Sequence, residues 1–316
     1  MKVKHFELRG LDGKRFACCA WTPANEPRAI LQIAHGMGEH KGRYTDVAEA
    51  LTSQGYAVYG SDHRGHGGTM AEDQPGAMGK NGWRLTLSDM NYLSEHARRI
   101  HPHVPTVLLG HSMGAALSQQ YLYMYGSDLA AAVLSGSPGF GVAWQLATMQ
   151  LVCRLEGLRS GPDMPSDLLQ SLLFGNNNKA FEDKDDTENT SGFEWLSKDL
   201  LQVKAYIEDP QCGFVLSPAS LAQMFAGMRD SAQGANVNAI KKNLPIYVLS
   251  GADDPVHNEE AGLIKLVEAY RGAGLSVDYK LYPEGRHEML NETNRVEVVA
   301  HLLDWLEDAL LKSATS

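Results

Sequence analysis

Short apolar segments alternate with amphipathic segments along the first 140 residues, and this alternation constrains the fold more than any other feature of the chain. Strands are predicted at residues 29–34, 56–60, 106–109 and 130–135, with helices between them at about 43–54 and 85–100. Strands separated by helices imply a parallel sheet that is covered on both faces. The sequence therefore predicts a doubly wound α/β domain.

The alternation stops between residues 141 and 240, where no convincing strand is present, and resumes afterwards. Within this stretch we predict helices at 144–155 and 219–228 and a solvated loop at the charged run 182–186. Beyond it we predict strands at 245–250 and 276–282 and helices at about 259–271 and 294–311. The chain of 316 residues is long enough for one large domain with an insertion. We therefore predict two core segments, 1–140 and 241–316, separated by a helical insertion at 141–240.

A Gly-His-Ser-Met-Gly pentapeptide at residues 110–114 lies between a predicted strand and a predicted helix. A G-x-S-x-G pattern at a strand-to-helix turn is typical of a nucleophile elbow, in which the serine has a strained backbone and the glycines prevent collisions. The N-terminus of the following helix favours negative charge beside the serine hydroxyl. The sequence therefore predicts Ser112 as a nucleophile.

A serine hydroxyl needs a base, and the base needs a third group that orients it. In this architecture the acid and the histidine follow the serine along the chain, each in a loop after a later strand. His287 follows the last predicted strand and is the predicted base. Asp254 follows the strand at 245–250 and is the predicted acid, with its neighbour Asp253 as the alternative. His111 diverges from Ser112 on the tight turn, so we expect it to pack or to hold the turn.

The oxyanion of a tetrahedral intermediate needs two backbone N–H donors. One is predicted at Met113, directly after the nucleophile. The other is predicted at Met37, in the loop His35–His40 that follows the strand ending at Ala34. Glycines on both sides of Met37 allow the backbone to turn its amides inward.

Other polar clusters are predicted to brace loops. His35, Glu39 and His40 lack the H-E-x-x-H spacing of a zinc site, and the charged turn at 62–67 has the same bracing character. No P-loop is present, and Gly36-Met37-Gly38 lacks the third glycine of a dinucleotide-binding motif. The sequence therefore predicts no metal and no cofactor.

Composition excludes several classes of partner and location. The net charge of −10 gives no electrostatic reason to bind nucleic acid or an anionic membrane surface. Residues 1–8 alternate like a strand and not like a signal peptide, and no run approaches the roughly 18 apolar residues that a membrane span requires. We therefore expect a cytoplasmic protein. The four cysteines are predicted to be free thiols, with the neighbours Cys18 and Cys19 on opposite faces of a strand.

Several motifs together resemble the monoglyceride lipase and lysophospholipase branch of the α/β-hydrolases. They lie in matching order at residues 35–40, 43–44, 55–56, 62–67, 110–114 and 285–288. The resemblance implies a mostly parallel eight-stranded sheet with a helical cap inserted after the sixth strand. It also implies Ser112, Asp254 and His287 as a catalytic triad, with Met37 and Met113 as amide donors. One departure is Ala115, where many members have a second glycine, and it affects helix packing and not the chemistry.

The resemblance implies hydrolysis of small-molecule carboxylic esters through a serine acyl-enzyme, with monoacylglycerols or related lipophilic acyl esters as substrates. A general short- to medium-chain carboxylesterase and an aminoacyl peptidase are the alternatives within enzymes. A non-catalytic binding protein with a hydrolase fold is the alternative from another class. The complete and correctly ordered set of triad candidates argues against the last of these.

Apolar residues of the insertion are predicted to face inward, and they form either a cap core or an acyl-chain tunnel, since flexible methionine suits a varied apolar ligand. They are Leu146, Met149, Leu151, Leu172, Leu173, Phe174, Met224, Phe225 and Met228. Acyl-chain preference, transient contact of the cap with a membrane surface, and the oligomeric state are left open by the sequence.

Overall fold

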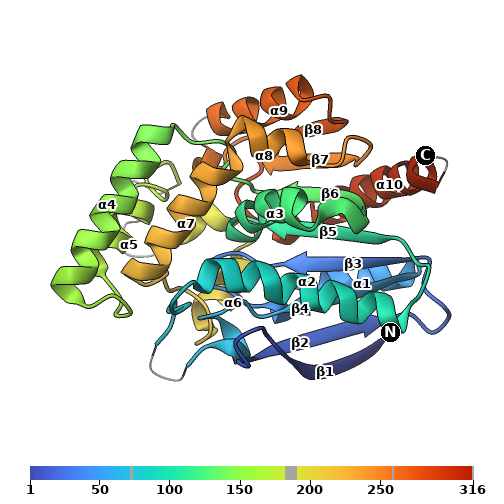
Figure 1. Cartoon of the computed structure of the whole chain (residues 1–316), viewed down its shortest axis with the longest axis horizontal. Coiled ribbons are helices and arrows are strands. Elements are labelled where there is room, and N and C mark those ends of the chain that lie inside the picture. Colours follow the sequence, from blue (N-terminus) through green and yellow to red (C-terminus); the bar gives the residue numbers. More distant parts are fainter. Residues whose placement is uncertain (72–73, 182–190, 258–259, 315–316) are drawn as a thin grey trace.

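A single eight-stranded sheet forms the centre of the molecule, in the order β1-β2-β4-β3-β5-β6-β7-β8 (Figure 1). The computed structural model describes residues 1–71, 74–181, 191–257 and 260–314. The strands are β1 (Lys2–Arg9), β2 (Arg15–Thr22), β3 (Ala29–Ala34), β4 (Tyr56–Ser61), β5 (Thr106–His111), β6 (Leu129–Ser135), β7 (Ile246–Gly251) and β8 (Val277–Tyr282). β1 pairs antiparallel with β2, and β2 pairs antiparallel with β4, whereas the other pairs are parallel. The predicted α/β-hydrolase fold is confirmed.

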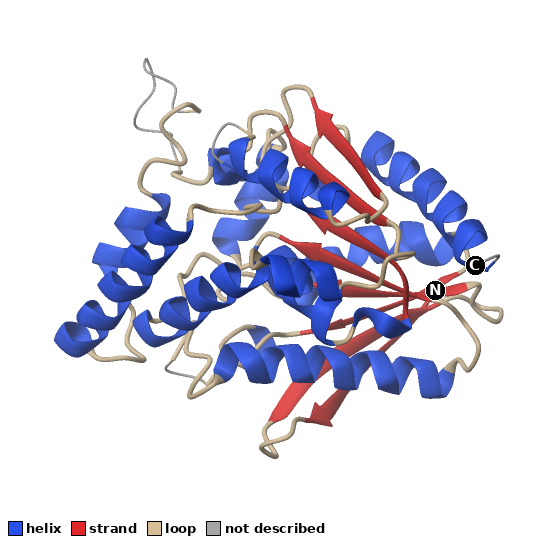
Figure 2. Ribbon diagram, turned by 45° about the horizontal axis from the view of Figure 1, so that its top comes forward, coloured by secondary structure: helices blue, strands red, loops and turns tan. Residues whose placement is uncertain are grey.

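Helices cover both faces of this sheet (Figure 2). One face carries α1 (Thr45–Ser53) and α10 (Arg295–Ala314), and the other carries α2 (Gly82–Ile100), α3 (Met113–Met124) and α9 (Ala261–Gly272). Alternate residues of the inner strands supply both faces, because side chains on a strand point to opposite sides. In β5, Val107 and Leu109 pack on the α1 and α10 side, and Leu108 packs on the α3 side. Continuous burial of these strands explains their unbroken apolar sequences.

The four cysteines are unpaired, as predicted. Cys18 and Cys19 of β2 enter two different buried clusters. This placement confirms that they point to opposite faces of the sheet.

Helices occupy the stretch between β6 and β7. They are α4 (Ala143–Ser160), α5 (Asp167–Phe174), α6 (Leu200–Glu208), α7 (Pro218–Ser231) and α8 (Gly234–Ala239), and no strand occurs there among the described residues. α4 and α5 lie beyond one end of the sheet, and α7 lies between them and the core (Figure 1). We did not predict α5 or α6. The sequence signal at the start of each helix is a single N-cap residue: Ser166 and Asp199 each accept a hydrogen bond from a backbone N–H of the first turn. The charged run at 182–186, predicted as a loop, lies outside the described residues.

The prediction for the inner side of the insertion is partly wrong. Seven of its nine residues are buried or half-buried, but Leu151 and Leu172 are 55% and 53% exposed. Leu151 lies two turns after Trp144 on α4, and this spacing places both side chains on the same face of the helix. That face points to solvent because α7 packs against the opposite side of α4, where Leu146 and Cys153 are buried.

Candidate active site

Ser112 occupies a strained turn between β5 and α3. Its φ and ψ are 53° and −116°, in a region that side-chain-bearing residues rarely adopt. A Cβ atom on Gly114 would collide with the Ala34 carbonyl, and one on Gly110 would collide with the Gly114 carbonyl. Both glycines are therefore needed for α3 to leave the sheet this sharply. The Ser112 N–H donates to the Ser135 carbonyl of β6 at 2.9 Å, which fixes the turn against the next strand.

Three side chains from three separate loops form one hydrogen-bonded series. His287, after β8, places Nε2 2.9 Å from Ser112 Oγ and Nδ1 3.0 Å from both carboxylate oxygens of Asp254, after β7. With the proton on Nδ1 donated to Asp254, Nε2 accepts the serine hydroxyl. Asp254 also accepts from Ser250 Oγ at 2.8 Å and from the Val256 N–H at 2.9 Å. The alternative acid, Asp253, is exposed.

The electrostatics of this series stabilise a positive charge on His287 beside the carboxylate of Asp254. Burial disfavours the ionised carboxylate, but His287 outweighs that effect, so the pKa of Asp254 lies below its usual value. Burial likewise disfavours the imidazolium, but the charge and hydrogen bond of Asp254 outweigh it and raise the pKa of His287. The arrangement can therefore take a proton from Ser112 and stabilise the imidazolium that results.

Two aromatic rings hold the imidazole of His287. The His111 ring lies 4.8 Å from it and the Trp195 ring lies 5.0 Å from it, centroid to centroid. Burial, followed by the charge of His287, lowers the pKa of His111. His111 thus packs against the predicted base, in agreement with the packing role expected for it. Trp195 was not anticipated, because nothing in its local sequence points to a residue 92 positions later.

The loop His35–His40 is braced as predicted. Glu39 Oε1 accepts from the Gly36 N–H and from Tyr44 OH at 2.8 Å. Met37, next to Gly36, and Met113 both line the cavity that contains Ser112. The loop also rests on the charged turn at 62–67, because the His63 N–H donates to His35 Nε2 at 2.9 Å.

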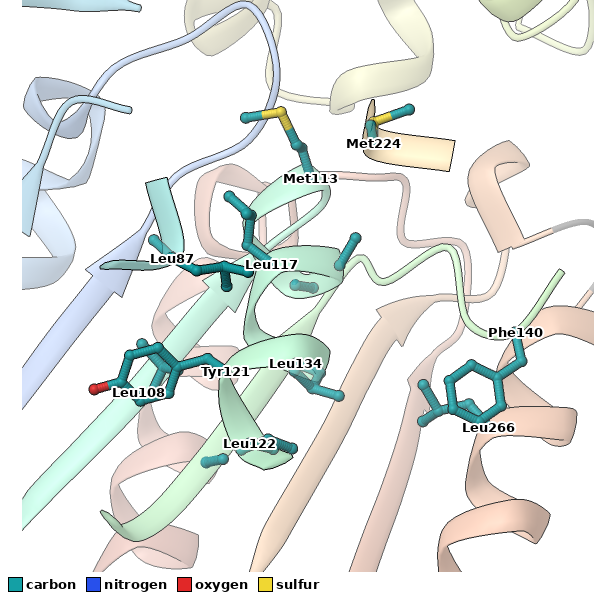
Figure 3. Packing of buried hydrophobic residues seen from close by; sticks show 14 of the residues in the cluster. Leu87, Leu108, Met113, Leu117, Tyr121, Leu122, Leu134, Phe140, Met224 and Leu266 are labelled. Atoms are coloured by element: carbon teal, nitrogen blue, oxygen red, sulfur yellow. The ribbon is translucent and has the colours of Figure 1, made fainter. Parts of the chain in front are cut away.

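A cavity of about 740 Å³ opens above Ser112, between the sheet and the insertion. Its lining combines apolar side chains of the core with those of the insertion, from α5, α7 and the segments between them. They include Met37, Met113, Trp195, Leu173, Phe174, Val215, Met224, Phe225 and Met228. Met113 and Met224 belong to the same buried cluster as Leu117 and Tyr121 of α3 (Figure 3). A mostly apolar chamber of this size, with the Ser112 hydroxyl in its wall, can hold a small apolar molecule.

The family described as serine aminopeptidase, S33, matches residues 25–294. The chain belongs to this family. Among curated members, a monoacylglycerol lipase of Mycolicibacterium smegmatis is 29% identical over 307 residues, 94% of each chain. The human monoglyceride lipase is 34% identical over 111 residues, 35% of each chain. The resemblance to monoglyceride lipases is therefore confirmed, and this S33 family member is a hydrolase of the lipase and esterase type.

Solved structures show the same fold as this S33 family member. A thermostable carboxyl esterase from Bacillus coagulans, in complex with glycerol, superposes with a TM-score of 0.87 at 24% identity, covering 98% of this chain and 99% of that one. A soluble variant of the Saccharomyces cerevisiae monoglyceride lipase, in complex with a substrate analogue, gives 0.76 at 18% identity, covering 98% and 95%.

The insertion of this S33 family member contacts both loops beside Ser112 through main-chain atoms. The carbonyls of Trp195 and Leu196 accept from the N–H groups of His287 and Glu288 at 3.3 and 2.8 Å. The Gly213 N–H donates to the Gly38 carbonyl at 3.0 Å. The path of the insertion's backbone thus fixes the loop of the histidine and the loop of Met37 together.

His40, Asp209 and Cys212 gather at the same junction. His40 Nδ1 accepts from the Gly42 N–H at 3.1 Å, so its proton lies on Nε2, which donates to Asp209 Oδ2 at 2.9 Å. A protonated Nε2 has no lone pair for a metal. Burial raises the pKa of the Cys212 thiol, which disfavours the thiolate that metals bind. The cluster acts as a polar tie between the insertion and the loop of Met37.

Proposed function

We propose that this protein is a serine esterase that hydrolyses lipophilic carboxylic esters, with monoacylglycerols as the favoured substrates. The observation that carries the proposal is the hydrogen bond between Ser112 Oγ and His287 Nε2, at 2.9 Å, in the wall of a mostly apolar cavity. The monoacylglycerol lipase of Mycolicibacterium smegmatis, similar over 94% of each chain, supports the same substrate class.

In the proposed mechanism, His287 takes the proton of Ser112 as the hydroxyl attacks the ester carbonyl. The N–H groups of Met37 and Met113 stabilise the oxyanion. His287 then donates its proton to the leaving alcohol, which frees glycerol or another alcohol and leaves the acyl-enzyme. Water, deprotonated by the same histidine, releases the fatty acid and restores Ser112. Asp254 keeps the histidine proton on Nδ1 and stabilises the imidazolium throughout.

The cavity favours esters over aminoacyl amides. A peptidase that binds a free amine needs an available carboxylate near its nucleophile. Glu39 and Glu288 line the cavity, but both are bound by Arg43. Asp167, a further carboxylate of the lining, is exposed to solvent in the first turn of α5.

A panel of acyl esters of increasing chain length, with monoacylglycerols and aminoacyl amides included, tests the substrate class. The wild-type protein is expected to prefer medium or long acyl chains, and a fluorophosphonate is expected to label Ser112. Met228→Trp adds bulk to the cavity wall, so we expect the long-to-short ratio of kcat/KM to fall by about tenfold.

Met124→Trp is the matched control, because Met124 is 37% exposed at the end of α3 and lies outside the cavity lining. An unchanged ratio in Met228→Trp would show that acyl chains do not occupy this cavity. Faster cleavage of aminoacyl amides than of esters would favour the peptidase.

We also propose that residues 141–240 act as a cap whose outer side makes transient contact with a lipid surface. Seven large apolar side chains of α4, α5 and the turn between them are 48–85% exposed: Trp144, Leu151, Leu155, Leu158, Met164, Leu168 and Leu172. Trp144, Leu151, Leu155 and Leu158 share one face of α4 by their spacing, and an exposed apolar face of this kind is typical of an interaction surface. In the described part of the chain, no helix is long and apolar enough to cross a membrane. The net charge of −10 favours uncharged lipid headgroups.

Co-sedimentation with phosphatidylcholine vesicles tests this contact. In the double variant Trp144→Ser, Leu158→Ser we expect the vesicle partition coefficient to fall by about 100-fold or more, because each lost side chain contributes roughly 1.5–3 kcal/mol when fully buried. Val296→Ser is the control, since Val296 is 81% exposed on α10, outside the insertion. Equal binding of the two variants would contradict the proposal.

A further inference from the structure

Three buried charged side chains connect the loop of Met37 with the loop of His287. Arg43 Nη1 donates to Glu39 Oε2 at 3.0 Å, and its Nη1 and Nη2 donate to the two carboxylate oxygens of Glu288 at 2.5 and 2.8 Å. The three side chains are 9%, 3% and 5% exposed. Buried charges need partners because of their desolvation cost, and here one guanidinium serves two carboxylates.

Each carboxylate is also bound to the loop that it belongs to. Glu39 accepts from the Gly36 N–H, immediately before Met37, and from Tyr44 OH. Glu288 directly follows His287, and its Oε2 accepts from Asn291 Nδ2 at 3.0 Å. A shift of the guanidinium would therefore displace both the proposed oxyanion donor and the proposed base.

The insertion covers this link. The ring of Tyr206, on α6, lies over the Arg43 guanidinium, with 4.8 Å between the ring centroid and Cζ. Burial is the first cause that raises the pKa of Tyr206, followed by the charge of Glu288, so the phenol stays neutral. Arg43 is thus held from two core loops and from the cap.

The same three groups affect the charge around His287. The ionisable groups that face this imidazole are Asp254 from the loop after β7, His111 from the end of β5, Glu39, and its own neighbour Glu288. Burial lowers the pKa of His287, and Asp254 raises it most, followed by Glu288 and Glu39. Arg43 leaves this group of two carboxylates and one guanidinium with a single net negative charge.

We propose that Arg43 is a positioning residue for the hydrolysis. It joins the loop of Met37 to the loop of His287 and limits the negative charge near His287. This inference rests on the proposed function. Arg43 takes part in catalysis through the two loops, because its guanidinium touches neither Ser112 nor Asp254.

Rates of Ser112 labelling by a fluorophosphonate, together with kcat and KM for a water-soluble short-chain ester, test the proposal across pH. In Arg43→Met we expect kcat to fall by about 100-fold with KM nearly unchanged, since a displacement of about 1 Å costs that much. The acidic limb of the plot of kcat against pH should move to higher pH. Two unpaired carboxylates raise the pKa of His287, and this histidine must be neutral to act as a base. In Glu288→Gln the limb should move to lower pH. Arg43→Lys keeps the charge, so its limb should stay near that of the wild type while kcat falls.

Arg64→Met is the electrostatic control, since Arg64 is also buried and bidentate, but its partners are Asp12 and Asp89, which are not among the main charges that raise the pKa of His287. It should lose thermal stability without a change in the pH profile. If Arg43→Met behaves like Arg64→Met, or if Glu288→Gln leaves the acidic limb in place, the inference is wrong. If Arg43→Met does not fold, the shift of the acidic limb in Glu288→Gln tests the inference by itself. Absence of labelling and ester cleavage in the wild-type protein would instead contradict the proposed function.

Discussion

Ser112→Ala is expected to lower kcat for ester hydrolysis by about 10⁶-fold and to abolish labelling by a fluorophosphonate. The loss is this large because the hydroxyl oxygen forms the covalent bond to the acyl group, and no other side chain in the described part of the site is placed to replace it. His287→Ala should cost nearly as much, and the double variant should cost no more than either. Initial rates and intact-mass measurements of the labelled protein give the result.

Ser118→Ala provides the comparison for this experiment. Ser118 is also buried on α3, where its hydroxyl donates to the Gly114 carbonyl, but it lies outside the cavity. Its activity should stay within about tenfold of the wild type, with a modest loss of thermal stability. Equal esterase activity of Ser112→Ala and the wild-type protein would eliminate the serine hydrolase, and a wild-type protein that is neither labelled nor active would favour a binding role for the fold.

Asp254→Asn is the second large effect, with an expected loss in kcat of about 10⁴-fold. An asparagine amide can donate to Nδ1 of His287, which moves the imidazole proton to Nε2 and leaves no lone pair for the serine proton. The pH profile should change as well. Asp254 raises the pKa of His287. Replacing this carboxylate with a neutral amide lowers that pKa, so the acidic limb of the plot of kcat/KM against pH should move to lower pH.

Asp253→Asn tests whether Asp253, and not Asp254, is the acid that orients His287. Asp253 is exposed, and surface substitutions alter stability little, so its activity should stay within about twofold of the wild type. Rates of the two variants measured on one ester from pH 5 to pH 9 decide between the neighbours. A larger loss in Asp253→Asn would overturn the assignment of the acid.

Local patterns in the sequence were enough to predict the parallel strands, the helices between them and the elbow, whereas the eight-stranded sheet was implied by the family resemblance. Periodicity places β3 at its observed bounds, and the glycines around Ser112 mark a turn that only such residues permit. The sequence favoured Asp254 over Asp253 as the acid but could not decide between them, because the two side chains differ in burial. That difference depends on where the loop after β7 meets the loop after β8, as in the bond between the Asp253 N–H and the Gly285 carbonyl.

Long-range contacts account for what the sequence did not predict. Arg43 and Glu288 are 245 positions apart, and no periodicity connects them. The outward turn of Leu151 depends on which side of α4 meets α7, and both sides of α4 carry apolar residues. A hydrophobic pattern indicates the buried side of a helix only where the other side is polar.

Three main-chain hydrogen bonds tie the insertion to the loops of His287 and Met37, through the carbonyls of Trp195 and Leu196 and the Gly213 N–H, in addition to the side-chain contacts described above. Backbone groups are the same in every amino acid, so side chains of α4, α5 and α7 can change while these bonds persist. The lining of the cavity can therefore vary in evolution with little effect on where the loops of His287 and Met37 lie. For protein engineering, the lining contributed by α5 and α7 is the part to randomise, and the segments at 195–196 and 213 are the part to keep.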